Sequence, residues 1–129
     1  MSAFKMGKGM KAGRVMDCRV AEIIYSGKSR WVDDQCVVQV GAVDYTVQRY
    51  STETGLAMGL VEKLSRQGWT VSMAVTLKSP GTKVTVQLRP EGKTSVDAIG
   101  EGDTIAEAIC KALIKRSTAG GRVFAGMHV

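Results

Sequence analysis

Two runs of alternating apolar and polar residues, joined by a turn, constrain the fold of this chain most. Every odd position of residues 69–77 is apolar, and every even position of residues 83–89 is valine or leucine. A period of two is typical of strands with one apolar face. Residues 79–81, Ser-Pro-Gly, can form a tight turn, because proline presets φ and glycine permits positive φ. Short turns join antiparallel neighbours, so a meander is predicted, with residues 93–99 as a weaker third strand.

Three segments with apolar residues at helical spacing predict helices over about residues 11–25, 51–67 and 105–116. The apolar face of the first is formed by Met16, Val20, Ile23 and Ile24. At the start of the third, Thr104 and Glu107 have the spacing of a capping box, in which each residue satisfies a free N–H group of the other.

Small residues indicate where the first two helices begin, end and pack. Ser51 or Thr52 is expected to accept a hydrogen bond from the first turn of the second helix. Gly27 is expected to end the first helix, because glycine tolerates the left-handed conformation. Gly55 and Gly59 lie four residues apart on one helical face, where we expect another backbone to approach closely.

A β-hairpin is predicted from residues 35–40 and 44–50, which are rich in valine, tyrosine and threonine and flank Gly41-Ala42. Its strands carry few charges, only Asp44 and Arg49. Because uncharged edges invite pairing with another chain, this hairpin predicts a homo-oligomer.

These elements predict one α+β domain, in which an antiparallel sheet (the three-stranded meander plus the extra hairpin) packs with three helices. The chain has 129 residues, enough for one domain of ordinary size. We expect residues 1–10 to form a flexible arm and residues 11–116 to form the domain, with the hairpin inserted at about 28–49. Residues 117–129 are expected to be a tail.

The charge of the chain is compatible with an anionic partner. Eighteen lysines and arginines face 12 acidic residues, a net charge of +6. Nucleic acid, a nucleotide or an acidic protein surface would each fit this charge, and so would a surface that is basic without a partner. No apolar stretch approaches the roughly 20 residues of a membrane span, and no signal peptide is expected.

Few residues suggest catalysis or metal binding. The one histidine, His128, is penultimate, so neither a Ser-His-Asp triad nor a histidine metal cluster is expected. Cys18, Cys36 and Cys110 are widely spaced among apolar neighbours, and we expect buried, reduced thiols and a cytoplasmic location. We therefore expect no enzyme activity, cofactor or metal.

Basic residues beside aromatic ones are the candidate ligand-binding residues. Guanidinium groups pair with phosphates, and rings stack on bases. Closing the hairpin would bring its two ends together and gather three cations and two rings. The candidates are Lys28, Arg30, Trp31, Arg49 and Tyr50, joined more weakly by Lys115 and Arg116. The alternative is that the tryptophan anchors a loop and the tyrosine packs over a strand end.

Three stretches of the sequence together resemble the phage ABA-sandwich domain family. They are Lys-Ala-Gly-Arg-Val-Met-Asp-Cys-Arg-Val-Ala-Glu at 11–22, Tyr-Ser-Thr-Glu at 50–53 leading into Val-Glu-Lys-Leu at 61–64, and Glu-Gly-Asp-Thr-Ile-Ala-Glu-Ala-Ile-Cys-Lys-Ala at 101–112. The family usually has proline where this chain has Ala106. The resemblance covers residues 11–26 and 50–116, and its motifs are caps, turns and core stripes that transfer no catalytic residue.

The resemblance implies a phage protein with a helix–sheet–helix layering that acts in the cytoplasm of the infected bacterium. Some anti-Thoeris proteins are distantly similar to this family and sequester a cyclic nucleotide signal. By analogy, the chain is expected to antagonise a bacterial defence system, either by sequestering such a signal or by binding a defence protein such as a CRISPR effector.

A second resemblance is one of topology. Helix, three strands and helix follow one another over residues 53–116, as in the double-stranded RNA-binding domain. That domain has a lysine cluster at the start of its last helix, where this chain has Thr-Ile-Ala-Glu at 104–107. A nucleic-acid-binding module is the alternative function.

Overall fold

The computed structural model describes residues 11–78, 81–119 and 123. Each of the two sheets is an antiparallel meander of three strands, with orders β1-β2-β3 and β4-β5-β6. In chain order the elements are α1 (Arg14–Tyr25), β1 (Lys28–Val32), β2 (Gln35–Val40), β3 (Val43–Thr46), α2 (Thr54–Arg66), β4 (Trp69–Lys78), β5 (Gly81–Pro90), β6 (Ala98–Gly102) and α3 (Ile105–Thr118). The predicted α+β class is confirmed.

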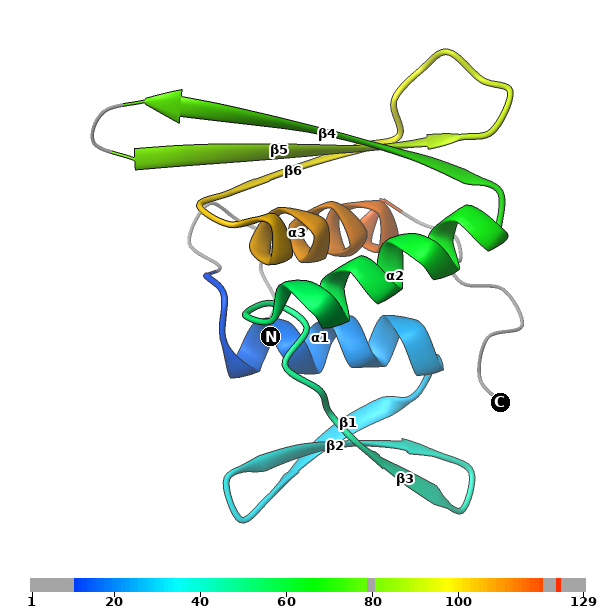
Figure 1. Cartoon of the computed structure of the whole chain (residues 1–129). Helices are drawn as coiled ribbons and strands as arrows, with labels where there is room; N and C mark the ends of the chain where they lie inside the picture. The colour runs from blue at the N-terminus through cyan, green and yellow to red at the C-terminus, as the bar shows by residue number, and fades with distance from the viewer. Residues whose placement is uncertain (1–10, 79–80, 120–122, 124–129) are drawn as a thin grey trace.

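The three helices lie between the two sheets (Figure 1). Helices α2 and α3 pack on the sheet of β4, β5 and β6, while α1 packs on α3 and on the sheet of β1, β2 and β3. The apolar faces predicted from periodicity meet in one core, in which Ile24 of α1, Leu64 of α2 and Leu113 of α3 are each at most 1% exposed.

The segment 28–49 forms a three-stranded sheet rather than a hairpin. The predicted strands at 35–40 and 44–50 correspond to β2 and to β3, which ends at Thr46. Strand β1 was not predicted. Lys28 and Arg30, which face away from α1, are charged, and the segment forms a strand through its pairing with β2. The predicted third meander strand also lies later in the chain, since β6 begins at Ala98.

Two helix boundaries differ from the predictions. Helix α1 ends with Ser26, not Gly27, in the left-handed conformation, at φ 53°. Helix α2 begins at Thr54, and no side chain caps it, because the Ser51 hydroxyl instead contacts Asp17 and Gly13 of the α1 region. The prediction failed because a local motif does not show that a distant helix competes for the same hydroxyl.

The capping box is confirmed. The Glu107 N–H donates to Thr104 Oγ1 at 3.1 Å, and the Glu107 carboxylate accepts from the Asp103 N–H at 2.8 Å. The helix continues two residues past the predicted end, to Thr118. Within the predicted tail, Val123 is buried, and its carbonyl accepts from Trp69 Nε1 at 3.2 Å. Residues 1–10, 120–122 and 124–129, which include His128, lie outside the described residues.

Close backbone packing occurs at a glycine other than the predicted ones. A Cβ added to Gly55 or Gly59 would meet nothing within 4 Å, so both predictions were wrong. At Gly100 in β6, an added Cβ would lie 2.3 Å from the Ala108 carbonyl oxygen and 2.3 Å from the Ala112 nitrogen. Glycine therefore lets α3 lie directly on β6.

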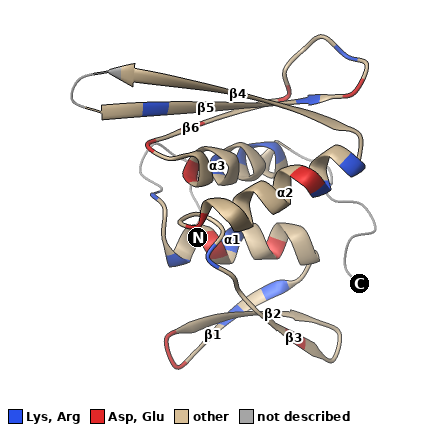
Figure 2. Ribbon diagram, in the orientation of Figure 1, with Lys and Arg blue, Asp and Glu red and all other residues tan. Residues whose placement is uncertain are grey.

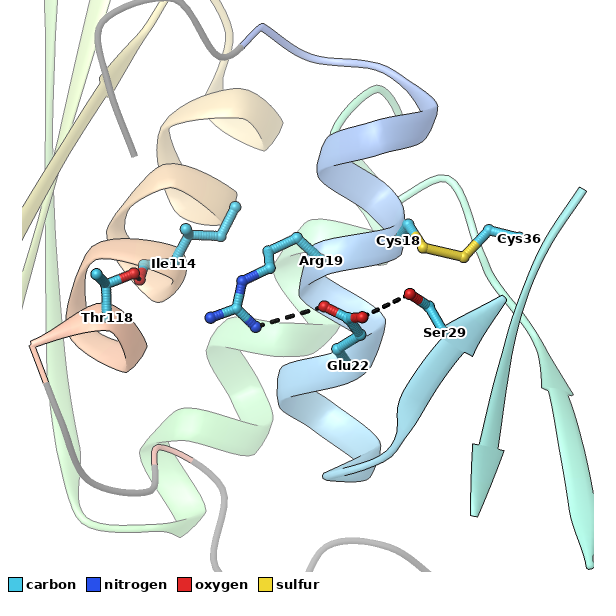
Figure 3. Close-up of polar contacts among 7 residues, drawn as sticks. All are labelled: Cys18, Arg19, Glu22, Ser29, Cys36, Ile114 and Thr118. Carbon is cyan, nitrogen blue, oxygen red and sulfur yellow. Dashed lines mark hydrogen bonds and ion pairs between the residues drawn. A yellow bond between two sulfur atoms is a disulfide. The ribbon is translucent and has the colours of Figure 1, made fainter. Parts of the chain in front are cut away.

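Two of the three cysteines form a disulfide, which corrects the prediction of reduced thiols. Cys18 of α1 and Cys36 of β2 are joined with their Cα atoms 6.0 Å apart (Figure 3). Beside it, Glu22 of α1 accepts a hydrogen bond from the Ser29 hydroxyl of β1. Both links hold the sheet of β1–β3 to α1. Cys110 is a buried free thiol.

Candidate ligand-binding site

A pocket of about 480 Å³ lies where the start of α1 meets the sheet of β1–β3 and the segment that leads from β3 to α2. Its volume is within the range of small-molecule sites. The lining residues are Gly13, Arg14, Asp17, Trp31, Gln35, Cys36, Thr46, Val47, Arg49 and Thr52.

Trp31 supplies the pocket with a flat aromatic face. It is directly opposite Cys36 in the β1–β2 ladder, so both side chains lie on the face of the sheet that packs on α1. Trp31 is 49% exposed, and the Arg14 guanidinium lies over its ring at 5.6 Å from the ring centroid. A half-exposed ring with a cation on it is a surface on which another planar group can stack.

Two arginines give the pocket its positive charge. The only described ion pair of Arg14 joins Nη1 to Asp34 Oδ2 at 3.5 Å, and both side chains are largely exposed. Such surface pairs contribute about 1 kcal/mol or less, so a ligand can displace this one. Arg49 is exposed and has no ion pair or side-chain hydrogen bond among the described residues. Both guanidinium groups are therefore available to an anion.

A buried carboxyl group, that of Asp17, lies beneath these cations. Asp17 Oδ1 accepts from the Ser51 N–H at 2.7 Å and from the Ser51 hydroxyl at 2.6 Å. Burial raises the pKa of Asp17 above its usual value of 3.8, although the bonds from Ser51 and the charge of Arg49 act in the opposite direction. Asp17 thus anchors the segment that carries Arg49 to α1.

Replacing Asp17 by Asn should flatten the pH dependence of stability. The pKa of Asp17 is higher in the folded protein than in the unfolded chain. Asp17 therefore contributes to the stability of the fold below the unfolded pKa, and this contribution is lost as pH rises through the folded pKa. Asn keeps the acceptor oxygen but does not titrate. The free energy of unfolding of the variant, relative to the parent, should therefore rise between about pH 3 and pH 7.

Urea denaturation at several pH values measures this difference. The control is Asp34→Asn, because the Asp34 side chain is 91% exposed and Asn tolerates the positive φ of 70° at this position. A difference between Asp17→Asn and the parent that stays constant with pH would contradict the assignment.

The structure brings together only part of the predicted ligand-binding set. Trp31 and Arg49 line the pocket, as expected. Arg30 lies on the opposite face of the sheet, where it pairs with Asp44 at 2.6 Å, because neighbouring residues of a strand point to opposite faces. Lys28 shares that outer face, and Tyr50 is buried in the core at 6% exposure. The predicted cluster of three cations and two rings is therefore wrong.

The two residues predicted from α3 lie beside the other sheet. Arg116 lies over the Trp69 ring at 5.4 Å and pairs with Asp97 at 3.4 Å. Lys115 is exposed. Neither lines the pocket of Trp31.

Sequence reasoning missed Arg14, Asp17 and Gln35, which also line the pocket. The sequence held one signal for Asp17. Asp17 and its hydrogen-bond partner Ser51 lie in two of the motifs that carry the family resemblance, 11–22 and 50–53. Their contact joins residues 34 positions apart, which no local spacing reveals.

Neither a metal site nor a membrane-spanning helix is found within residues 11–78, 81–119 and 123. In these residues no group of three His, Cys, Asp or Glu side chains is placed to hold a metal ion. No helix in the same part of the chain has the length and apolar character needed to cross a membrane.

Comparison with known proteins gives one family and a fold relative. The family model of the phage ABA sandwich domain matches residues 12–114. A phage protein from Bacillus cereus ATCC 14579, known from a 2.0 Å crystal structure, has a similar fold with a TM-score of 0.59. It is 23% identical, and the match covers 89% of this chain and 99% of that one. No curated protein matches this chain significantly.

Proposed function

This chain belongs to the phage ABA sandwich domain family, and we propose that it is a non-enzymatic phage protein that binds an anionic, ring-bearing ligand. One observation carries the proposal: the exposed face of Trp31 lies in the same pocket as the guanidinium groups of Arg14 and Arg49. Guanidinium groups pair with phosphate oxygens in a planar fork, and indole rings stack on bases. A nucleotide combines both features.

The pocket favours a small nucleotide. Its volume of about 480 Å³ suits a ligand with one or two bases rather than a long strand. The pocket's carboxyl group, Asp17, already accepts two hydrogen bonds from Ser51, which supports an anchoring role and not a general base. We therefore propose sequestration of the ligand without turnover.

The biological role that we propose is antagonism of a bacterial defence system in the host cytoplasm. Sequestering a cyclic nucleotide signal would lower its free concentration below what a defence effector needs. Binding to a defence protein, such as a CRISPR effector, is the other form that this antagonism could take, and the same positive pocket would then meet an acidic side chain.

Calorimetric titration with cyclic di-AMP and cyclic ADP-ribose tests the proposal. Replacing Arg49 by Ala should weaken binding about tenfold or more, because a charged hydrogen bond contributes roughly 1.5–3 kcal/mol. The matched control is Arg30→Ala, which removes an exposed arginine from the opposite face of the same sheet and should leave affinity unchanged.

The bound nucleotide should be recovered intact after the protein is denatured by heat, as measured by mass spectrometry. Turnover of the nucleotide would overturn the non-enzymatic proposal. Absence of binding to both cyclic nucleotides, or an equal loss of affinity in the Arg30 and Arg49 variants, would overturn the assignment of the pocket.

The net charge of +6 favours a second candidate function, binding of nucleic acid. The described lysines and arginines lie on both sheets and on the helices rather than along one stripe (Figure 2). Gel-shift titrations from low to moderate salt separate the two functions, because affinity for a phosphate backbone falls steeply with salt. No shift at low salt would exclude this candidate.

A further inference from the structure

Strand β4 is a long free edge of its sheet. It spans ten residues and pairs along one side with β5, and no described strand pairs with its other side. Residues 69–77 contain no charged side chain, and β4 is accordingly drawn without blue or red in Figure 2. Natural edge strands are usually short, or protected by charge, proline or a bulge. Over residues 69–77 this strand has none of these sequence protections, and its one charged residue, Lys78, is the last of the strand.

The apolar face of β4 is also uncovered along half of the strand. Met73, Val75 and Leu77 are 37%, 55% and 81% exposed. They lie on the same face as Val84 and Val86 of β5, which are opposite Val75 and Met73 and are at most 2% exposed. The difference arises because α3 packs on β5 and β6 but not on β4, and α2 is the only described helix that contacts β4.

We propose that β4 is the surface at which a second copy of this chain adds to the sheet, strand against strand and antiparallel. The two copies would form one continuous sheet of six strands with β4 at its centre. Pairing would satisfy the outward backbone groups of β4, and it would bring the two exposed apolar stripes together on the side that faces the helices.

The geometry of the strand makes it complementary to itself. Outward N–H and C=O groups occur on every second residue, so an antiparallel pair related by a two-fold axis can form only between residues of the same parity. The five large apolar residues from Trp69 to Leu77 are all odd-numbered. Every permitted register therefore places apolar side chains opposite apolar ones, and an axis through Ala74 would pair Val71 with Leu77 and Met73 with Val75.

The other sheet edges fit a second copy less well. Strand β1 has five residues and carries Lys28 and Arg30, and β3 has four residues and carries Asp44. Strand β6, the other edge of the sheet of β4, has five residues and carries Glu101. Like charges brought together across a two-fold axis repel each other. The sequence predicted self-association through the hairpin of β2 and β3, and the structure offers β4 as the better edge.

The test compares two exposed valines on edge strands. Val75 of β4 is 55% exposed and Val43 of β3 is 50% exposed, so both should accept lysine without unfolding. In sedimentation equilibrium at tens of micromolar, the parent and Val43→Lys should have twice the mass of the chain. Val75→Lys should have the mass of a monomer, because two lysines would be buried at the new strand pair.

Hydrogen exchange of the parent gives a second readout that needs no substitution. Backbone amides of residues 70–77 should exchange more slowly at high than at low protein concentration, while those of β3 should not change. A monomeric parent, or a dimer that Val43→Lys dissociates and Val75→Lys does not, would overturn the proposal. Concentration-independent exchange of β4 would also overturn it.

Discussion

Replacing Gly100 by Ala is expected to lower the free energy of unfolding by about 3 kcal/mol. The added Cβ would lie 2.3 Å from both the Ala108 carbonyl oxygen and the Ala112 nitrogen. These are helix backbone atoms, which cannot rotate away as a flexible side chain would. Helix α3 must then move off β6 and lose packing along its buried face. Urea denaturation followed by circular dichroism measures the loss.

The matched control is Gly59→Ala, which should have the opposite sign. An added Cβ at Gly59 meets nothing within 4 Å, and alanine is favoured over glycine inside a helix by up to about 1 kcal/mol. The control variant should therefore be as stable as the parent or more stable. If Gly100→Ala unfolds at the same urea concentration as the parent, the close contact between α3 and β6 is not required for the fold.

Replacing both Cys18 and Cys36 by Ser is expected to lower the free energy of unfolding by about 3 kcal/mol in oxidising buffer. The disulfide closes a loop between residues 18 positions apart, and a loop of this length restricts the unfolded chain by about that amount. Adding a reductant should destabilise the parent by a similar amount and leave the double variant unchanged. Thermal and urea denaturation with and without reductant make the comparison.

Thiol titration checks the pairing independently. The chain has three cysteines, so the denatured, unreduced parent should contain one reactive thiol, that of Cys110. In the folded protein this thiol should react slowly, because burial raises its pKa well above the usual range and little thiolate is present. Three reactive thiols in the denatured parent would contradict the disulfide.

The disulfide also bears on the candidate binding site. Cys36 lines the pocket beside Trp31, and its bond to Cys18 fixes the distance between β2 and α1. The glutathione and thioredoxin systems of a bacterial cytoplasm reduce most disulfides. Measuring nucleotide affinity with and without reductant would therefore report how far the pocket depends on this bond, separately from its effect on stability.

Sequence patterns predicted those helices and strands whose signals are local. Alternation over residues 69–77 and 83–89 predicted β4 and β5, because the strand period of two is a property of the backbone. The same holds for the apolar stripe of α1 and the capping box of α3, which depend on residues at most eight positions apart. Together with the family motifs, these signals sufficed for the α+β class.

Packing between distant segments determines which residues share the pocket and which apolar residues stay exposed, and no local pattern reveals it. Arg30 and Trp31 are adjacent in sequence but lie on opposite faces of β1, while Asp17 and Ser51 are distant in sequence and in contact. Leu77 continues the pattern of the buried face yet is 81% exposed, because α3 does not pack on β4. Periodicity fixes the side of an element on which a residue lies, but what covers that side depends on packing between elements far apart in the chain.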